Sequence, residues 1–322
     1  MKKVLVLINK ISDHPTPDEL DVLVQAEAIG KSLKELGYEH QREFFDLDLK
    51  KITSILQENP PDLVFNLVET VAGKGELIHL LPSLLESFNV PFTGSGSFAL
   101  LVTTNKIRAK KILRENNLPT PEWFVNNDTN KPDIRKKYII KPAWEDGSAG
   151  ITDDSIITGN QVNLQELSRS MKLKNIFIEE YIHGREFNMS IIAGKDGPEI
   201  MPVAEMQYVD FPADKPRILT YASKWDEKSF EYSHTVRTFD IADSDHELYA
   251  ALRNITRRCW DLFELRGYAR VDFRVDEQNQ PYVLEVNSNP CLSPDAGFPA
   301  ACARAGLSFT EIVNRIIQDA HI

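Results

Sequence analysis

The sequence predicts a chain of mixed α/β and α+β class, with an open α/β domain at the amino end and strand-rich structure after it. Residues 4–8 form an unbroken apolar run, typical of a strand buried on both faces of a parallel sheet, and a helical pattern follows. Residues 268–290 hold two short runs of alternating apolar and polar residues around a polar break, which predicts a β-hairpin. The 322 residues are enough for two or three domains with cores of their own.

Composition and charge exclude several classes of protein. The net charge of -11 argues against a general binder of nucleic acid or of anionic membranes. The three cysteines are widely spaced and form no C-x-x-C pair, so neither a disulfide framework nor a zinc site is expected. The apolar run near the start is too short for a signal peptide, and no stretch approaches the ~20 apolar residues of a membrane span. We therefore expect a cytoplasmic protein.

Residues 1–98 are expected to form the amino-terminal α/β domain. A helix should begin after Thr16, where a capping box precedes a proline at the first helical position, and it should end at Gly37. Residues 75–88 also have a helical period, but Pro82 means that this segment is either kinked or divided in two. Further strands are expected at residues 44–45, 63–67 and 90–93, and a further helix at 53–58.

Two further subdomains are expected, a central one at residues 99–185 and a carboxy-terminal one at 186–322. The central one should contain a basic helix at 103–116, strands at 136–141 and 176–182, and a glycine-bearing loop at 142–151. The carboxy-terminal one should contain a strand at 186–193, a helix at 245–263, the hairpin and a closing amphipathic helix at 309–320.

The hairpin has a register in which its apolar faces meet without slipping. In this register a four-residue loop joins Asp276 to Pro281, and the apolar pairs are Val275–Tyr282, Phe273–Leu284 and Val271–Val286. The same register places Asp272 opposite Glu285 and Arg270 opposite Asn287.

Two carboxylates at cross-strand distance repel unless a cation lies between them. Carboxylate and amide oxygens suit Mg²⁺, and an arginine beside them suits phosphate oxygens. We therefore interpret this patch as a magnesium–polyphosphate site. The alternative is a hairpin whose polar face is simply solvated.

Two other motifs carry candidate nucleotide contacts. Gly147 and Ser148 lie in a loop that follows a strand ending in Lys141, so backbone N–H groups, a hydroxyl and an ammonium group could meet phosphates. This loop is neither a P-loop nor G-x-G-x-x-G, and a plain surface turn is the alternative. The strand at 178–182 leads to Glu186, and an apolar slot next to a carboxylate suits adenine and ribose. The alternative there is a strand end with solvated acids.

Taken together, these motifs resemble the ATP-grasp fold and, within it, the D-alanine–D-alanine ligase family. The resemblance is carried by Lys106 on the basic helix, Lys141 before the Gly/Ser loop, and EEYIHGREF at 179–187. It is carried further by RVDF and LEVNSNP of the hairpin and by PFTGSG at 91–96. It extends over nearly the whole chain.

The resemblance implies that ATP and Mg²⁺ are used, with two ions expected and Mn²⁺ as a substitute. The implied phosphate ligands are Lys106, Lys141, Gly147, Ser148 and Ala149, and the implied adenosine contacts are Glu179, Glu180, Tyr181, Ile182 and Glu186. The implied metal ligands are Asp272, Glu285 and Asn287, and the implied catalytic residues are Arg270, Lys224, Asp18 and Ser148. In the family a carboxylate attacks the γ-phosphate, and an amine displaces the acyl phosphate that forms.

The chain departs from the family pattern at the amino-acid subsites. A Ser-Leu pair that holds the acceptor's carboxylate in the family falls on Ala296 and Gly297, and Asp295 beside them would repel a carboxylate. We place the acceptor subsite at Asn289, Ser293 and Asp295, and we expect an acceptor amine with a neutral or cationic end.

The predicted function is an ATP-dependent carboxylate–amine ligase, most like D-alanine–D-alanine ligase of peptidoglycan precursor synthesis. The alternative is a related amino-acid or peptide ligase with another acceptor, outside cell-wall synthesis. A nucleotide-binding regulator would not need the whole charged patch of the hairpin, and an NAD-dependent dehydrogenase would need the G-x-G-x-x-G that is missing. The expected substrates are small amino acids or short peptides, and the resemblance favours a homodimer.

Overall fold

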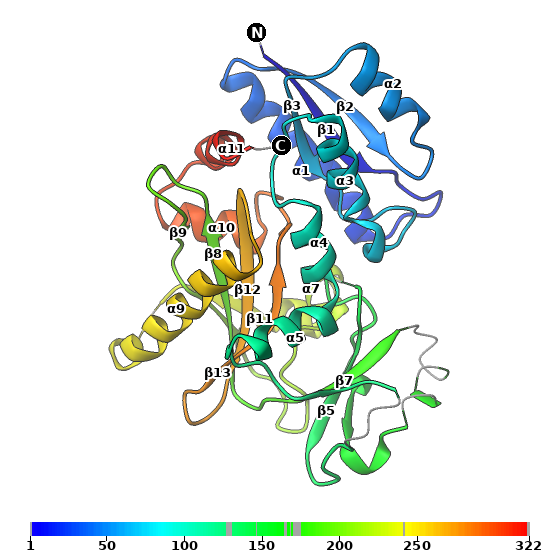
Figure 1. Ribbon diagram of the computed structural model, residues 1–322. Helices are drawn as coiled ribbons and strands as arrows, with labels where there is room; N and C mark the ends of the chain where they lie inside the picture. Colours follow the sequence, from blue (N-terminus) through cyan, green and yellow to red (C-terminus); the bar gives the residue numbers. More distant parts are fainter. Residues whose placement is uncertain are drawn as a thin grey trace.

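The computed structural model describes residues 2–126, 131–145, 147–163, 166, 167, 169, 175–240 and 242–320. These residues form three β-sheets, which lie one after another along the molecule (Figure 1). No helix in the described ranges is both long enough and apolar enough to span a membrane.

The first sheet is parallel and has the strand order β2-β1-β3. Its strands are β1 (Lys3–Asn9), β2 (Glu39–Phe45) and β3 (Leu63–Leu67), and its helices are α1 (Pro17–Glu35), α2 (Lys50–Glu58), η1 (Gly75–Leu77) and α3 (Leu80–Phe88). The capping box at Thr16 is present, as predicted. The helical segment around Pro82 is divided in two, with the proline in the first turn of α3. The strand predicted at 90–93 forms only an isolated bridge from Phe92 to Val64.

The second sheet is antiparallel and has the order β4-β7-β5-β6. Its strands are β4 (Trp123–Phe124), β5 (Lys137–Pro142), β6 (Ile156–Thr158) and β7 (Ile176–Glu180), with short 3-10 turns η2 (Asp153–Ser155) and η3 (Gly159–Gln161). Its small apolar core includes Tyr138, Ile140 and Ile178.

The third sheet has the order β11-β10-β8-β12-β13, with β9 paired to β8. Its strands are β8 (Arg185–Ile192), β9 (Glu199–Ile200), β10 (Ala204–Tyr208), β11 (Thr235–Thr238), β12 (Tyr268–Val275) and β13 (Pro281–Asn287). The helices in this part of the chain are α7 (Tyr221–Trp225), α8 (Phe230–His234), η4 (Asp243–Asp245), α9 (His246–Leu262), α10 (Gly297–Arg304) and α11 (Phe309–Gln318).

The predicted basic helix at 103–116 is two helices, α4 (Ser97–Thr104) and α5 (Lys106–Glu115). Asn105 has extended backbone, and its side chain accepts a hydrogen bond from the backbone N–H of Arg108. Because asparagine caps a helix in this way, α5 begins at Lys106 and the prediction of one continuous helix is wrong.

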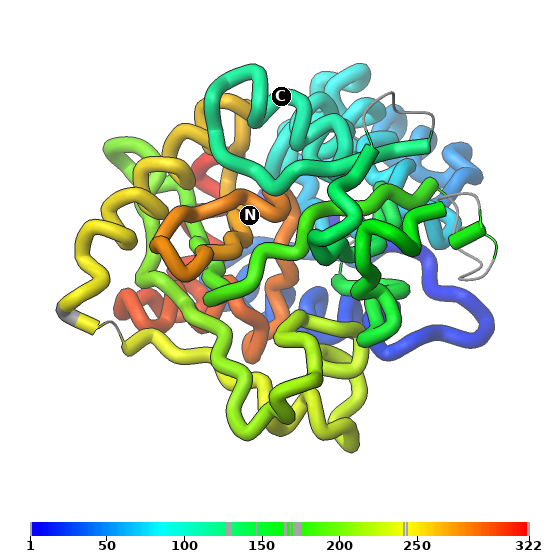
Figure 2. Tube along the Cα trace, turned by 90° about the horizontal axis from the view of Figure 1, so that it is seen from below, coloured from blue at the N-terminus to red at the C-terminus, as the bar shows by residue number. Residues whose placement is uncertain are grey.

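Two apolar cores join parts of the chain that are far apart in sequence. One core packs α4, α5 and α9 against β8 and β12 of the third sheet. The other packs α10 and α11 against β1 and α1 of the first sheet. Seen from below, the orange hairpin lies in the centre, with yellow α9 on one side and the green strands of the second sheet on the other (Figure 2). The predicted domain boundaries, at residues 98 and 185, stay a prediction.

The hairpin register agrees with the prediction only at its charged end. Asp272 pairs with Glu285 and Arg270 with Asn287, as predicted. Beyond Asp272 the pairing shifts by one, so the predicted pairs Phe273–Leu284 and Val275–Tyr282 are wrong; Phe273 instead pairs with Val283, and Val275 with Pro281. The cause is a β-bulge in which Leu284 is an extra residue of β13.

The bulge changes which residues of β13 face the core. Val283 and Val286 are both buried in the core of the third sheet. Leu284 and Glu285, which lie between them, both line a pocket on the other side. An apolar residue thereby joins the acidic face of the hairpin.

Candidate active site

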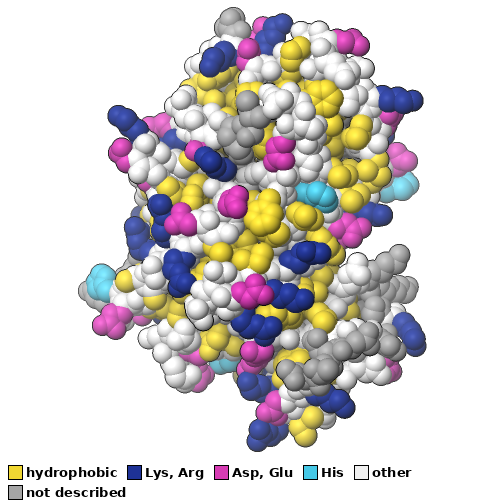
Figure 3. Space-filling view, in the orientation of Figure 1, with side chains coloured by type: hydrophobic (Ala, Val, Ile, Leu, Met, Phe, Trp, Pro, Cys, Tyr) yellow, Lys and Arg dark blue, Asp and Glu magenta, His cyan; other side chains and the backbone are white. Residues whose placement is uncertain are grey.

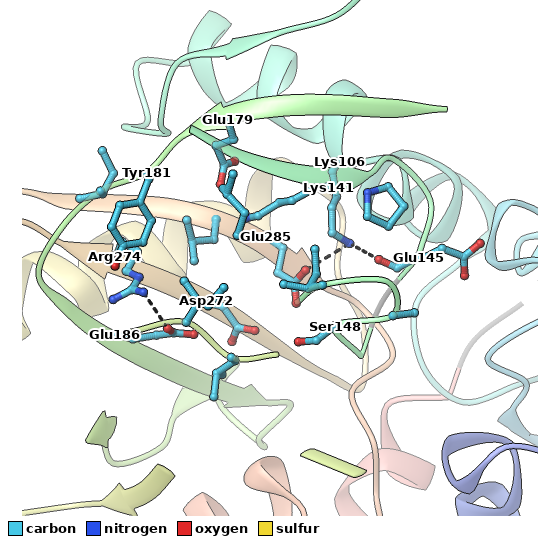
Figure 4. A pocket seen from close by; sticks show the side chains of 18 of the residues that line it. Lys106, Lys141, Glu145, Ser148, Glu179, Tyr181, Glu186, Asp272, Arg274 and Glu285 are labelled. Carbon is cyan, nitrogen blue, oxygen red and sulfur yellow. Dashed lines mark hydrogen bonds and ion pairs between the residues drawn. The ribbon is translucent and has the colours of Figure 1, made fainter. Parts of the chain in front are cut away.

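Two adjoining hollows lie between the sheets. The smaller one, about 100 Å³, lies between β5 and β7 of the second sheet and β12 and β13 of the third, and we call it the sheet pocket (Figure 4). The larger one, about 540 Å³, reaches from the third sheet to α1, and we call it the wide cavity. Glu145, Ala149, Leu219 and Lys224 line both hollows, so the two adjoin at these residues. Figure 3 shows Lys and Arg side chains gathered over the middle of the visible face, near α5.

Asp272 and Glu285 lie at the junction of the two strands that the sequence predicted to bring them together. Arg270 donates two hydrogen bonds to Asp272, from Nε to Oδ1 and from Nη2 to Oδ2, each 2.7 Å long. Asn188 on β8 donates a third, from Nδ2 to Oδ1, at 2.8 Å. Burial and the neighbouring Glu285 raise the pKa of Asp272 even though Arg270 opposes the rise.

Glu285 lies among cations. Its Oε2 is 3.2 Å from Nζ of Lys106, which also donates to the backbone oxygen of Glu145 at 2.8 Å (Figure 4). Burial opposes ionisation of Glu285, but Lys106, Lys224 and Arg270 outweigh it and hold the pKa of this carboxyl well below its usual value. Burial and Arg270 lower the pKa of the Lys224 ammonium. The hairpin patch is therefore a charged cluster enclosed by protein, not a solvated face.

A buried ion triad supports the lysine at the end of β5. Glu179 is 1% exposed, and its Oε1 accepts from Nζ of Lys141 at 2.6 Å while its Oε2 pairs with Lys110. The sequence predicts that Glu179 lines the adenine, and it does line the sheet pocket, but its carboxylate is already held by two lysines. The triad therefore positions Lys141, and Lys110 on α5 is a participant that sequence reasoning missed.

The far end of the sheet pocket combines a carboxylate with aromatic and cationic partners. Oε2 of Glu186 accepts from the hydroxyl of Tyr208 at 2.5 Å. The same oxygen is 3.5 Å from Nη2 of Arg274 (Figure 4). The guanidinium of Arg274 also lies over the rings of Tyr181 and Tyr208. Glu180, in contrast, pairs with Lys136 near the surface at 2.7 Å.

Between these ends, the sheet pocket is apolar. Its hydrocarbon lining includes Ile139, Ile151, Ile182, Ile218, Leu219 and Leu284. Because Leu284 enters through the β-bulge, strict strand alternation could not predict it. A flat apolar slot next to a carboxylate is the kind of site that holds a nucleoside.

The glycine-bearing loop closes one side of both hollows. Gly147, Ser148 and Gly150 have positive φ values of 66°, 64° and 74°. Backbone of this kind forms concave surfaces of N–H groups that bind anions. Nε1 of Trp225 on α7 donates to the backbone oxygen of Gly147 at 3.3 Å, which ties the loop to a second segment. Asp146, which belongs to the predicted loop, lies outside the described residues.

The wide cavity collects the residues predicted for the amino-acid subsites. Oδ1 of Asp18, at the start of α1, accepts from the hydroxyl of Tyr221 at 2.7 Å. Ser293 donates to Asp21 at 2.6 Å, and Asn289 both donates to the backbone oxygen of Val68 and accepts from Tyr268. Ser293 and Asn289 therefore line the cavity while their side chains are bonded within the protein.

Asn287, Asp295 and Arg237 complete the wall of the wide cavity. Oδ1 of Asn287 accepts from the backbone N–H of Asn289 at 2.9 Å. Asp295 is exposed, and its backbone oxygen accepts from Arg237 of β11 at 3.4 Å. Sequence reasoning did not single out Arg237, because nothing in the local pattern of β11 connects it with a segment about sixty residues away.

The donor set suits magnesium better than a transition metal. Among the described residues, no group of three or more His, Cys, Asp and Glu could hold a metal ion. Two adjacent carboxylates and one amide oxygen are hard ligands, and Mg²⁺ is commonly bound by one or two carboxylates together with phosphates and water. The raised pKa of Asp272 indicates a carboxyl pair that a divalent cation would stabilise.

Comparison with known proteins agrees with this geometry. The family model described as "D-ala D-ala ligase C-terminus" matches residues 122–318. A D-alanine–D-alanine ligase of Rickettsia massiliae is 30% identical over 302 residues, covering 92% of this chain and 87% of the relative. An uncharacterised protein of Sinorhizobium fredii is also 30% identical, over 308 residues, with the same coverage of both chains.

Solved structures have the same fold. The D-alanine–D-alanine ligase of Bacillus anthracis in complex with ATP superposes with a TM-score of 0.75 at 20% identity, covering 99% of this chain and 97% of the other. The enzyme of Coxiella burnetii superposes with a TM-score of 0.70 at 16% identity, covering 99% of this chain and 95% of the other. The predicted ATP-grasp fold is thereby confirmed, and the chain belongs to the D-alanine–D-alanine ligase family, as an ATP-dependent ligase.

Proposed function

We propose that this ligase joins the carboxylate of one amino acid to the amine of a second, with D-alanine as both substrates, as the names of its relatives indicate. The observation that carries the proposal is the charged cluster at the junction of the two hollows. Lys106, Glu285 and Lys224 lie where a nucleotide's terminal phosphate in the sheet pocket would meet a small substrate in the wide cavity.

The sheet pocket is the proposed ATP site. Its apolar lining would hold adenine, and Glu186, oriented by Tyr208 and Arg274, would accept from the ribose hydroxyls. Lys106 is held by the backbone oxygen of Glu145 and by Glu285, and Lys141 is held by Glu179, so both present a fixed cationic group to phosphates. Ser148 and its flanking glycines would cover the same phosphates.

Asp272, Glu285 and Asn287 are the proposed ligands for two Mg²⁺ ions, with Mn²⁺ as a substitute. Bound ions would neutralise the phosphate oxygens and make the terminal phosphorus easier to attack. Arg270 is fixed by both of its hydrogen bonds to Asp272, so its third nitrogen can face the transferring phosphoryl group without reorganisation. The substrate carboxylate would attack that group and displace ADP, which gives an acyl phosphate. The amine of the second amino acid would then attack the acyl carbon, and phosphate and a proton would leave as the amide bond forms.

The amino-terminal domain would contribute the ammonium contact for the first amino acid. Asp18 lines the wide cavity, and Tyr221 from α7 holds its carboxylate in place. This hydrogen bond also connects α7, which contains Lys224, to α1, so binding of the first amino acid and placement of the cation would depend on each other.

The test is release of ADP in a coupled assay, with purified protein, ATP, Mg²⁺ and a panel of D- and L-amino acids offered singly and in pairs. We expect turnover with D-alanine alone and identification of the dipeptide by mass spectrometry. Turnover only with another pair would favour the second candidate, a ligase with a different acceptor. That candidate is supported by Asn289 and Ser293, whose side chains are engaged within the protein. Absence of turnover with every pair would refute the proposed function.

A further inference from the structure

Arg237 lines the wide cavity but has no role in the proposed reaction. Arg237 lies on β11, at the edge of the third sheet, and is half-buried. Its guanidinium donates to the backbone oxygen of Asp295 at 3.4 Å. It forms no ion pair, within 4.0 Å, with a carboxylate of the described residues. The guanidinium of Arg237 therefore has N–H donors available for an anionic ligand, such as a carboxylate or a phosphate.

Arg237 and Arg270 converge on the same small space. A Cβ atom placed on Gly297 would be 3.9 Å from Nε and Nη2 of Arg237, and 3.9 Å from Nη1 of Arg270. Because Nε and Nη2 of Arg270 are bonded to Asp272, Nη1 is the nitrogen left to face this space. Burial and the neighbouring Arg270 lower the pKa of Arg237, as expected for two cations held close together.

The space also lies at the start of a helix. Gly297 is the first residue of the eight-residue helix α10, and Ala296 at its N-cap gives no side-chain hydrogen bond. A helix start without a side-chain cap favours an anion, in the same direction as the two arginines. The negative charge of Asp295 weakens this attraction for an anion in part, but the side chain of Asp295 is exposed to solvent.

The other two uncharged side chains predicted for the acceptor subsite are not available to bind an anion. Asn289 and Ser293 are bonded to Tyr268, Val68 and Asp21. Arg237 is therefore the available donor that compensates for the hydroxyl missing at Ala296.

We propose that Arg237 is a specificity-determining residue that binds the free α-carboxylate of the acceptor amino acid at the start of α10. Arg270 lies beside it, and its Nη1 carries two N–H groups, one for this carboxylate and one for the phosphoryl group. This inference rests on the proposed function and replaces the expectation, drawn from Asp295, that the acceptor has a neutral or cationic end. The guanidinium would hold the carboxylate while the amine of the same amino acid faces the acyl phosphate. The acceptor class is then an α-amino acid with a free acid group, and its amide is a poor acceptor.

The experiment is a competition between D-alanine and D-alaninamide at equal concentrations, with ATP and Mg²⁺. Only D-alanine can be the donor, because the amide has no carboxylate to phosphorylate. The ratio of dipeptide to dipeptide amide, measured by mass spectrometry, therefore reports the acceptor alone. We expect the wild type to favour the dipeptide by about tenfold or more, and Arg237→Met to lower that ratio by about ten- to a hundredfold, the range for a lost hydrogen bond to a charged group.

Two further variants make the result decisive. Arg237→Lys keeps the charge but not the two-nitrogen fork, so its ratio should be intermediate, and it serves as the deciding variant if Arg237→Met does not fold. Arg304→Met removes the same charge from the exposed end of α10 and should leave the ratio unchanged.

The experiment distinguishes failure of the inference about Arg237 from failure of the proposed function. A wild type that prefers the amide, or an unchanged ratio in the Arg237 variants, would overturn the inference while dipeptide formation upheld the proposed function. If D-alanine is not a substrate, the acid and amide of the acceptor found in the panel take its place in the same competition. Absence of ADP release with every amino acid would overturn both proposals.

Discussion

At the scale of single residues, a substitution of Glu285 can distinguish a catalytic role of its carboxylate from a structural one. Glu285→Gln removes a carboxylate that repels Asp272 and attracts Lys106, so the two effects on folding oppose each other. We expect the melting temperature by circular dichroism to change little and ATP turnover to fall by about a hundredfold or more, because a metal ligand is lost. The matched control is Glu277→Gln in the exposed hairpin loop, which should retain full activity. Unfolding of Glu285→Gln would mean that the carboxylate is structural.

Tyr221 gives a pH dependence whose sign can be worked out. Burial and the hydrogen bond to Asp18 raise the pKa of Tyr221 to about 12. The unfolded chain loses this proton near pH 10, so the contribution to stability is complete below pH 10 and is lost as the pH rises towards 12. Absorbance titration at 295 nm should show one phenolate transition near pH 12 in the wild type that is missing from Tyr221→Phe. A difference centred at pH 10 would show that the phenol is not held by Asp18.

At the scale of elements, the hairpin shows how far alternation can be used for prediction. It predicted the pairs around Asp272 and Arg270 correctly, because a one-residue slip there would have buried charges in the core. It could not predict the bulge, because Val283 and Leu284 are adjacent apolar residues and either could face the core. The break at Asn105 had a clearer signal, since asparagine is a strong helix N-cap. The sequence contained no such signal for Arg237, because only the tertiary fold brings β11 close to α10.

The bulge leads to a prediction about ATP binding. Without Leu284, the pairs Asp272–Glu285 and Phe273–Val283 become consecutive, so the deletion should preserve the ladder and the buried valines. Deletion of Leu284 and Leu284→Ala should both fold and should both raise the KM for ATP by about tenfold, because an apolar side chain of the sheet pocket is lost. Leu47→Ala, at an exposed leucine, is the control. If Leu284→Ala folds and the deletion does not, the account of the register is wrong.

At the scale of the whole molecule, the site is assembled from segments that are far apart in the sequence. Asp18 comes from α1, which packs against the first sheet, Lys141 comes from the second sheet and Asp272 from the third, while Lys106 begins the helix α5. The order of the motifs and the family resemblance predicted a shared site for these residues, and all four line the two adjoining hollows. Their roles in the reaction stay a prediction. The packing of α10 and α11 against β1 and α1 was not predictable, because their apolar stripes do not identify a partner. The homodimer stays a prediction.

This assembly predicts that the nucleotide stabilises the molecule only together with magnesium. A non-hydrolysable ATP analogue with Mg²⁺ would bridge the second and third sheets. At a hundredfold excess over its Kd, the analogue would add about 2.7 kcal/mol to the free energy of unfolding. This corresponds to a rise of roughly 5 °C in the melting temperature. EDTA should remove most of this shift. Asp272→Asn should lose the part that depends on Mg²⁺ and keep the smaller part from adenine, whereas Glu277→Gln should behave as the wild type. A shift of equal size with and without Mg²⁺ would mean that the two hairpin carboxylates do not hold the ion, because phosphate binding would then depend on the lysines alone.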